Sequence, residues 1–415
     1  MATGGMMDLD WSDAEAEFAR EIRALFEREL TPELRAGAAG MTSVYADHDV
    51  SMAWQAKLHA RDLAAPHWLP EHGGHDWSAA QFYLWARERA RAGVPPLSPM
   101  GIHMVAHVIA AFGTDEQKAY FLPGILSGEI FFCQGYSEPG AGSDLAALQM
   151  SAVADGDDFV LNGSKIWTTH AGEANWIFCL VRTAKGERPQ QGITFLLVPM
   201  DQPGVTVRPL TMISGETIQA EVFFDDARSA KANVIGAVDR GWSVAKYLLE
   251  FERGGSAHAP ALAMRLDALA RHAAGTPAGE GMLGDDPVFA HKLARARIRI
   301  DILEMIELRL LSSAGQGESV GVMASLMKIM ATELAQHITE LGYEAAGPAG
   351  TAFQPHAGCP GADVPAHAPP ADGHITGEPW QAIAPLRYFN ERAGSIYAGS
   401  NEIQRNILAK AVLGL

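Results

Sequence analysis

Cysteine is scarce in this chain of 415 residues. Its three cysteines, Cys133, Cys179 and Cys359, lie far apart and form no Cys-x-x-Cys pair. A disulfide framework or a thiolate metal site needs more cysteines at closer spacing, so neither is expected. No secretory segment precedes the first of them, and the pattern therefore indicates a cytoplasmic protein kept in a reducing compartment.

Long hydrophobic runs and an excess of positive charge are also missing. The most apolar stretches, such as residues 193–200, are shorter than the roughly 20 residues of a membrane-spanning helix, so no membrane span is expected. Lysine plus arginine number 32 against 49 aspartates plus glutamates, a net charge of -17. This charge repels a phosphate backbone and disfavours nucleic acid as a partner. With 48% hydrophobic residues, the chain is expected to form a globular protein of roughly two or three domains.

The spacing at which hydrophobic residues recur divides the chain into three parts. They follow a leader at 1–9, in which hydrophobic residues have no regular spacing. Residues 10–130 carry helical patterns that begin at a capping box formed by Ser12 and Glu15. Residues 131–240 change to short runs rich in Val, Ile, Phe, Trp and Thr, which are typical of strands. Helical patterns return over 241–415, interrupted by a Pro- and Gly-rich excursion at 347–385. Helices are predicted over 53–62, 79–92, 101–112, 115–126, 242–273, 287–314, 318–346 and 401–413.

Two local features inside these parts lead to definite expectations. Asn162-Gly163 predicts a two-residue hairpin turn between strands 158–161 and 164–169, because this pair readily takes the positive φ angles of a type I′ turn. The excursion contains several potential metal ligands, but their spacings match no compact ligand pattern, so no metal site is predicted. These ligands are His356, Cys359, Asp363, His367 and His374.

Three short segments carry residues suited to a flat or anionic ligand. Residues 134–144 form a glycine-rich loop that leaves a strand and offers backbone amides and hydroxyls. In residues 165–170, Trp167 offers a flat π surface and Thr169 a hydroxyl on the same strand face. In residues 395–407, Ser400 can cap a helix whose N-terminus favours an anion. Taken singly, the three segments could equally be a surface turn, a core tryptophan and a plain helix cap.

Together, in this order and at these separations, the segments resemble the signature stretches of the acyl-CoA dehydrogenase family. The likeness runs from about residue 10 to the end of the chain. It implies an α+β multidomain fold with an N-terminal all-α domain, a middle β-barrel or β-sandwich domain and a C-terminal four-helix bundle. It also implies FAD as cofactor, held between the β domain and the bundle and completed by a neighbouring subunit.

The resemblance assigns roles to the residues at matching positions. FAD would be bound by residues from all three segments, with Trp167 flanking the isoalloxazine ring. These residues are Gln134, Tyr136, Ser137, Ser143, Trp167, Thr168, Thr169, Ser400 and Glu402. The acyl-CoA substrate would contact Ser143, Phe251, Arg253, Ala398, Gly399 and Lys410.

The catalytic base departs from the commoner pattern of the family. Many members carry a glutamate directly after the tyrosine of the third segment, where this chain has Ala398. A minority of members place the base on the first helix of the bundle, and Glu252 occupies that position. The helix period agrees, because Val244, Leu248 and Glu252 share one apolar stripe while Glu250 points away. A carboxylate in apolar surroundings has a raised pKa and can act as a general base, whereas the plain alternative is a solvated surface glutamate.

A second departure lies in residues 271–284. This stretch lacks the Phe-Gly pair that often helps family members bind the FAD of a neighbouring subunit. Arg271 is then the candidate contact to the pyrophosphate.

The sequence therefore predicts an acyl-CoA dehydrogenase of fatty acid or lipid catabolism that converts an acyl-CoA thioester to its trans-2-enoyl product. Glu252 would remove the α-proton, and the backbone amide of Ala398 would donate to the thioester carbonyl as part of an oxyanion hole. The resemblance implies a tetrameric homo-oligomer, a dimer of dimers, with electron-transfer flavoprotein as electron acceptor. Three alternatives stay open: a structural partner subunit of a mixed oligomer, an acyl-CoA oxidase-like flavoenzyme, and a relative acting on a non-CoA substrate.

Overall fold

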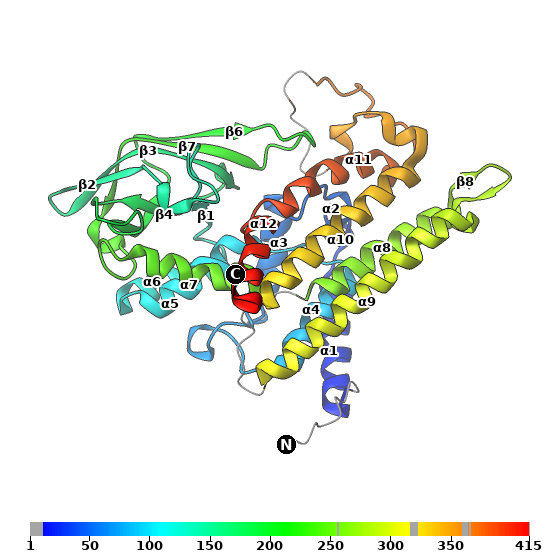
Figure 1. The fold of residues 1–415 in the computed structure, drawn as a ribbon, viewed down its shortest axis with the longest axis horizontal. Coiled ribbons are helices and arrows are strands. Elements are labelled where there is room, and N and C mark those ends of the chain that lie inside the picture. Colours follow the sequence, from blue (N-terminus) through cyan, green and yellow to red (C-terminus); the bar gives the residue numbers. More distant parts are fainter. Residues whose placement is uncertain (1–10, 255–256, 316–322, 359–363, 365–366, 415) are drawn as a thin grey trace.

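The computed structural model describes residues 11–254, 257–315, 323–358, 364 and 367–414. Helices of the N-terminal part, a curled sheet and long C-terminal helices follow one another along the chain (Figure 1). Among the described residues, none of the helices is long and apolar enough to cross a membrane.

The N-terminal part is helical because apolar stripes of successive helices meet in one core. Phe26, Trp54 and Trp85 lie at its centre, with ring centroids 5.9 and 5.1 Å from that of Phe26. The capping box of Ser12 and Glu15 is present as predicted. The elements are α1 (Asp13–Glu29), α2 (Pro32–Gly40), α3 (His48–His59), η1 (Pro70–His72), α4 (Ala79–Ala92), the π-helical η2 (Met100–Val105), α5 (Ala106–Phe112) and α6 (Asp115–Ser127).

The middle part is a seven-stranded sheet in the order β1-β4-β2-β3-β7-β6, with β5 paired to β4. Its inward side chains, such as Ile177 and Leu196, are fully buried. The strands are β1 (Phe132–Gly135), β2 (Ser151–Asp155), β3 (Asp158–Thr169), β4 (Trp176–Arg182), β5 (Ile193–Pro199), β6 (Val205–Leu210) and β7 (Gln219–Ala230), with 3-10 turns η3 (Leu145–Ala147) and η4 (Lys231–Asn233).

The hairpin predicted at Asn162-Gly163 is wrong, because β3 runs through this pair without turning. The turn instead joins β2 to β3 at Gly156, which has a φ of 58°. At Gly163 the pairing with β7 shifts register, and the Asn162 side chain bonds to Asp226 across this bulge at 2.9 and 3.0 Å. A Cβ on Gly163 would lie 2.9 Å from the Met150 backbone, so the glycine serves a close approach inside the sheet.

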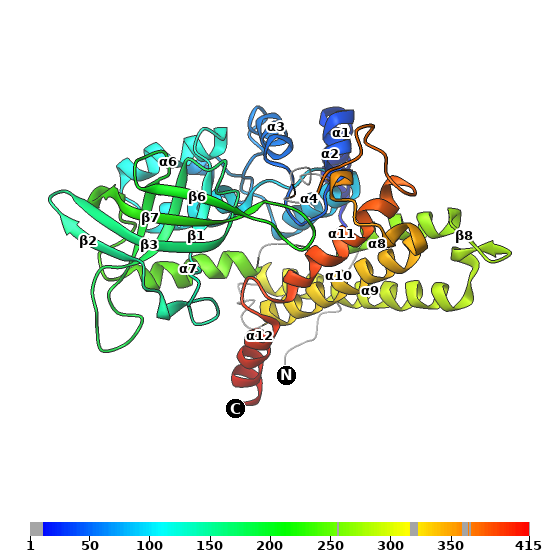
Figure 2. The same cartoon turned by 90° about the horizontal axis from the view of Figure 1, so that it is seen from above.

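The C-terminal part contains a bundle in which α8, α9, α10 and α11 run side by side (Figures 1 and 2). Helix α7 lies apart from it, under the sheet, where it packs against β5, η2 and α5. The elements are α7 (Gly241–Gly254), α8 (His258–Gly275), β8 (Pro277–Ala278), β9 (Gly281–Met282), η5 (Leu283–Asp285), α9 (Pro287–Gly315), α10 (Met323–Ala346), η6 (Gly347–Thr351), η7 (Pro355–Ala357), α11 (Pro379–Glu391), η8 (Arg392–Ser395), α12 (Asn401–Leu408) and the π-helical η9 (Ala409–Leu413).

Two sequence expectations for this part are wrong. The single helix predicted over 242–273 is two helices, and the break follows Gly254, at a Gly-Gly pair of low helix propensity. The excursion predicted to reach residue 385 already gives way to α11 at Pro379, because Glu378 and Gln381 form a capping box around a proline at the first helical position. Pro385 then lies inside that helix.

The metal ligands noted in the excursion can be placed only in part. The Nδ1 atom of His356 lies 3.2 Å from Nε2 of His367, and its Nε2 lies 3.0 Å from the His374 carbonyl oxygen. Cys359 and Asp363 lie outside the described residues. Within the part of the chain that the structure describes, no three His, Cys, Asp or Glu side chains gather as metal ligands would.

Candidate active site

A buried ion pair fastens the first segment to the second. Lys165 of β3 is fully buried, and its Nζ donates to Glu138 at 2.8 Å and to the carbonyl oxygens of Leu180 and Tyr136 at 2.7 and 3.3 Å. The Glu138 carboxylate also accepts the backbone amides of Gln149 and Met150 at 2.6 and 3.0 Å. Every charge is thereby compensated, and the glycine-rich loop is held against β3.

The second segment contains a bulge that turns Trp167 outward. The Ile166 amide donates to the Ser137 carbonyl at 2.9 Å, and the register with β7 shifts between Lys165 and Thr168. Trp167 has a φ of 60° and is 57% exposed, a costly conformation for a bulky aromatic residue and one that often marks a functional position. The sequence predicted that Trp167 and Thr169 share one face of the strand, because side chains two residues apart point to the same side of a regular strand. The bulge breaks this alternation.

Two threonines beside the bulge are buried. The Thr168 hydroxyl has no hydrogen-bond partner among the described residues, whereas that of Thr169 bonds to the Gln219 side chain at 2.9 and 3.2 Å. The ring of Tyr136 is buried edge-on against Phe178. Ligand contacts at Tyr136 would therefore come from its backbone. Gln134 and Ser137 are half-buried, and Ser143 is exposed at the far end of the loop.

The third segment is anchored to α10 rather than to the sheet. Ser400 caps α12 as predicted. Buried Gln404 donates to the carbonyl oxygens of Ala398 and Gly399 at 3.3 and 3.1 Å and accepts from Ser325 at 2.7 Å. Ala398 and Gly399 have φ angles of 53° and 78°. No hydrogen bond between described residues uses the Ala398 amide, which is therefore available to a ligand.

The remaining predicted residues lie at helix ends. Glu402, whose pKa is lowered by its own backbone amide and the Ser400 hydroxyl, is exposed in the first turn of α12, and Lys410 is exposed in η9. Phe251, Glu252 and Arg253 belong to α7, but their side chains lie outside the described residues. The stripe that leads to Glu252 does face the interior, because Val244, Ala245 and Leu248 are buried.

Several residues of this region were not predicted from the sequence. Glu138 and Lys165 lie inside the segments named above, but nothing local in either segment indicated that the two side chains form a buried pair. Gln404 and Gln219 gave no signal either, because Ser325 lies 79 residues from Gln404, and Thr169 lies 50 residues from Gln219.

Glu216 links the β6–β7 connection to α11. It is 1% exposed and accepts from the Asn390 amide at 2.8 Å. Burial raises the pKa of its carboxyl from 4.5 to about 8, so the folded protein holds this proton more tightly than the unfolded chain does.

The pH dependence of stability should show this carboxyl. The pKa of this carboxyl is higher in the folded protein than in the unfolded chain. Its contribution to the free energy of unfolding is therefore complete below about pH 4.5 and is lost as the pH rises to about 8. Glu216→Gln keeps an acceptor for Asn390 but cannot ionise, and should flatten this fall. Unfolding midpoints measured between pH 5 and 9 test this prediction. The control is Glu187→Gln, which changes an exposed glutamate. Parallel pH profiles for the wild type and Glu216→Gln would contradict the prediction.

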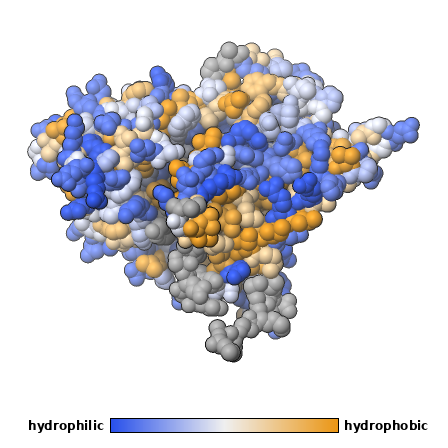
Figure 3. Space-filling view, viewed as in Figure 1, coloured by the Kyte–Doolittle hydropathy of each residue, from blue (hydrophilic) through white to orange (hydrophobic). Residues whose placement is uncertain are grey.

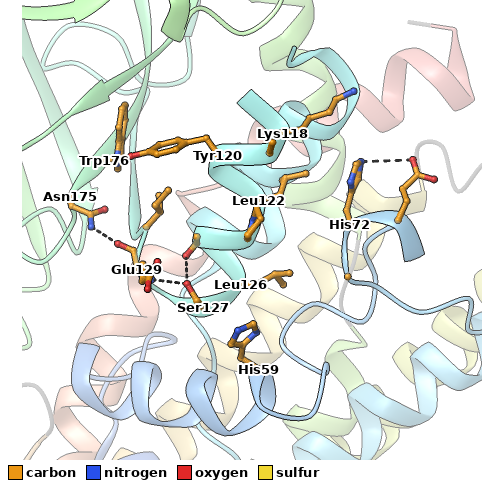
Figure 4. Close-up of a pocket in the computed structure, with 16 residues that line it drawn as sticks. His59, His72, Lys118, Tyr120, Leu122, Leu126, Ser127, Glu129, Asn175 and Trp176 are labelled. Carbon is orange, nitrogen blue, oxygen red and sulfur yellow. Dashed lines mark hydrogen bonds and ion pairs between the residues drawn. The ribbon is translucent and has the colours of Figure 1, made fainter. Parts of the chain in front are cut away.

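A pocket of about 950 Å³ lies elsewhere, on the outer face of α6 (Figure 4). Its lining includes His59, His72, Lys118, Tyr120 and Trp176. None of the predicted site residues lines it. The flavin segments are therefore not part of this pocket.

Comparison with known proteins gives consistent matches over almost the whole chain. Family models match in order: the N-terminal domain of acyl-CoA dehydrogenase at 12–129, the middle domain at 133–227 and the C-terminal domain at 239–413. Acyl-CoA dehydrogenase IpdE1 of Mycobacterium tuberculosis is 36% identical over 409 residues, covering 96% of this chain and 97% of that protein. Acyl-CoA dehydrogenase FadE26 of the same organism is 32% identical over 416 residues, covering 99% of each.

Solved structures give the same match. The ChsE4-ChsE5 complex from Mycobacterium tuberculosis has a TM-score of 0.80 at 31% identity, over 99% of both chains. The Tcur3481-Tcur3483 steroid ACAD has a TM-score of 0.81 at 26% identity, also over 99% of both chains.

Proposed function

The chain belongs to the acyl-CoA dehydrogenase family, and from that premise we propose how its residues carry out the reaction. The protein is an FAD-dependent oxidoreductase that dehydrogenates an acyl-CoA thioester between its α and β carbons, and its family acts in lipid catabolism. The observation that carries the site is the outward-turned Trp167, fastened beside the glycine-rich loop.

The residues present fit FAD. Trp167 offers an exposed aromatic face, and the buried Thr168 hydroxyl beside it still lacks a partner among the described residues. We assign FAD to the residues already named from the three segments: Gln134, Tyr136, Ser137, Ser143, Trp167, Thr168, Thr169, Ser400 and Glu402. When bound, FAD supplies the acceptor for the hydride that leaves the substrate β-carbon.

The proton chemistry is assigned to Glu252. Its carboxylate removes the α-proton, and the Ala398 amide donates to the thioester carbonyl, where negative charge develops. The two carbonyl oxygens of this loop are occupied by Gln404, which supports the assignment because it fixes the backbone and leaves the amide free to bind a ligand. Phe251, Arg253, Ser143, Gly399 and Lys410 are the proposed contacts to acyl-CoA.

Purified protein should show flavin bands in its visible spectrum that bleach when an acyl-CoA is added without oxygen. The electrons are then expected to pass to electron-transfer flavoprotein or to an artificial dye. Absence of flavin bands after incubation with excess FAD would refute the cofactor assignment. Peroxide formation in air at the rate of dye reduction would instead establish the oxidase-like alternative.

We propose domain boundaries at 10–130, 131–240 and 241–415. The change from helix to strand between α6 and β1, and the return to helix between η4 and α7, support them. We also propose a cytoplasmic location, which the two buried free thiols of Cys133 and Cys179 support.

We propose that the FAD site is completed across subunits of a homotetramer. Apolar side chains of α9 face outward at helical spacing, with Ile298, Ile302 and Met305 exposed by 57%, 49% and 40%. Figure 3 shows apolar surface in this region, and Figure 2 shows α12 projecting from the body. Exposed apolar surface of this kind favours association. A homo-oligomer is preferred because this chain carries all three flavin segments and the base.

A mixed oligomer is the specific alternative, because two similar solved structures are named with two components each. Light scattering of the chain expressed alone, combined with flavin counted per chain, decides between them. A tetramer with one FAD per chain supports the homo-oligomer. A monomer that turns over fully would refute subunit sharing, and flavin binding only after addition of a second, different chain would establish the mixed oligomer.

A further inference from the structure

The turn that precedes α12 has an unusual backbone conformation. Two successive residues, Ala398 and Gly399, lie in the left-handed region, with φ angles of 53° and 78°. A residue other than glycine holds such a conformation only where its surroundings determine it. Ile396 and Tyr397, which lead into the turn, are exposed, so packing holds little of this segment. Hydrogen bonds are therefore needed to fix it.

The side chain of Gln404 supplies these hydrogen bonds. Side chains of a helix lean toward its N-terminus, and that of Gln404 reaches back from the first turn of α12 past the Ser400 cap. Its Nε2 donates to the carbonyl oxygens of Ala398 and Gly399 at 3.3 and 3.1 Å. In the part of the chain that the structure describes, no other side chain bonds to these two carbonyl groups. One amide thus fixes both peptide units of the turn.

Glycine at position 399 makes room for this amide. A Cβ built on Gly399 would lie 2.6 Å from Nε2 of Gln404, so a larger residue would push the amide away from the turn. The positive φ angle already favours glycine here. The close approach of Gln404 is a second reason for this glycine, and it does not depend on any ligand.

Helix α10 sets the orientation of the Gln404 side chain. The Ser325 hydroxyl donates to Oε1 of Gln404 at 2.7 Å, which directs Nε2 toward the turn. The same helix holds Asn401, whose Oδ1 accepts from Lys328 at 2.9 Å and whose Nδ2 donates to Thr332 at 3.1 Å. Gln404 and Ser325 are 1% and 3% exposed. The first turn of α12 is thus fastened at two points to a helix that packs against α8, α9 and α11 (Figure 2).

We propose that Gln404 is a positioning residue for the dehydrogenation. It holds the Ala398 amide where it can donate to the thioester carbonyl, and Ser325 keeps Gln404 in the orientation that this requires. The inference rests on the proposed function and adds the residue that makes its oxyanion site rigid. A donor of this kind contributes about 10²–10³-fold in rate because it is fixed before the reaction starts. A displacement of about 1 Å can cost on the order of 10²-fold.

The first test measures anaerobic flavin reduction in the FAD-loaded, full-length protein. The substrate is whichever straight-chain acyl-CoA, from butyryl-CoA to palmitoyl-CoA, reduces the wild-type flavin fastest. Gln404→Met keeps the length of the side chain but removes both donors, and should lower the saturated rate per bound flavin by about 10²-fold. KM should change much less, because the amide acts on charge that develops in the transition state. Asn406→Ala, which removes an exposed amide from the same helix, should keep the wild-type rate.

A ligand that forms a stable enolate gives a readout that a merely structural role would not move. Bound 3-oxooctanoyl-CoA loses the proton between its two carbonyl groups as the pH rises, and a fixed donor at the thioester oxygen lowers the pKa of this step. Ultraviolet absorbance of the enolate measures this pKa. Gln404→Met should raise it by about one pH unit or more, the scale of a hydrogen bond to a charged group.

Ser325→Ala tests the orienting role. It should slow flavin reduction less than Gln404→Met does, and the double variant should be no slower than Gln404→Met alone, because Ser325 acts through Gln404. If Gln404→Met does not fold or retain flavin, Ser325→Ala decides in its place. A slower rate with a raised enolate pKa then supports the inference, and unchanged values overturn it.

An enolate pKa that Gln404→Met leaves unchanged overturns the inference at any rate of reduction, because the Ala398 amide would then be in place without Gln404. A wild-type rate in this variant overturns it as well. Both outcomes require an active wild type. If no acyl-CoA of the series bleaches the wild-type flavin, the proposed function fails instead, and the enolate pKa of wild type and variant still decides the role of Gln404.

Discussion

Glu252→Gln is expected to slow anaerobic flavin reduction by about 10²-fold or more while FAD and acyl-CoA binding persist. Glutamine has nearly the size of glutamate and keeps a hydrogen-bonding end, but it cannot accept the α-proton. Stopped-flow absorbance of the flavin measures the rate, and equilibrium titration with the enoyl product measures binding. A loss confined to the rate would show that the carboxylate acts in the transition state.

Glu250→Gln is the matched control. Both glutamates lie in α7, two positions apart, and residues two apart in a helix do not share a face. Glu250→Gln should reduce its flavin at nearly the wild-type rate. A normal rate in Glu252→Gln together with a slow one in Glu250→Gln would transfer the role of base to Glu250.

A second test places the carboxylate in the other position used by the family. Glu252→Gly combined with Ala398→Glu should restore part of the lost rate. Ala398 already holds a Cβ at a φ of 53°, so the longer side chain adds no new backbone strain. Full recovery is not expected, because a base displaced by about 1 Å can cost on the order of 10²-fold.

Local signals in the sequence were enough to predict some of the helices. The capping box at Ser12 and the bounds of α4 follow from residues within one turn of each other, and both are confirmed. The turn signal of Asn162-Gly163 is equally local, yet the hairpin predicted from it is wrong. Its conformation is set by Asp226 on β7 and by the backbone at Met150, which a short window cannot contain.

The candidate site shows the same limit. The three segments could be found because each is short and compositionally distinct. How they are held could not be predicted, because Lys165 reaches Glu138 from 27 residues away and Gln404 reaches Ser325 from 79.

Lys165→Met is expected to lower the free energy of unfolding by about 3–5 kcal/mol, the scale of breaking a buried ion pair from one side. The change leaves the Glu138 carboxylate buried with only two backbone amides and deprives the Leu180 carbonyl of its donor. FAD should be lost as well, since the pair fastens the glycine-rich loop to the strand that carries Trp167. Denaturant unfolding followed by tryptophan fluorescence, and flavin content after gel filtration, measure the two effects.

The control is Lys185→Met, which removes an exposed lysine from the connection between β4 and β5, and it should change the free energy of unfolding by less than about 0.5 kcal/mol. Removing both charges in Lys165→Met with Glu138→Gln should cost less than the sum of the single changes, because no unpaired charge then stays buried. Such coupling would show that Lys165 compensates Glu138 rather than only filling space. A Lys165→Met protein as stable as the control, with its flavin intact, would show instead that the backbone bonds between Ser137 and Ile166 hold the two segments together without the ion pair.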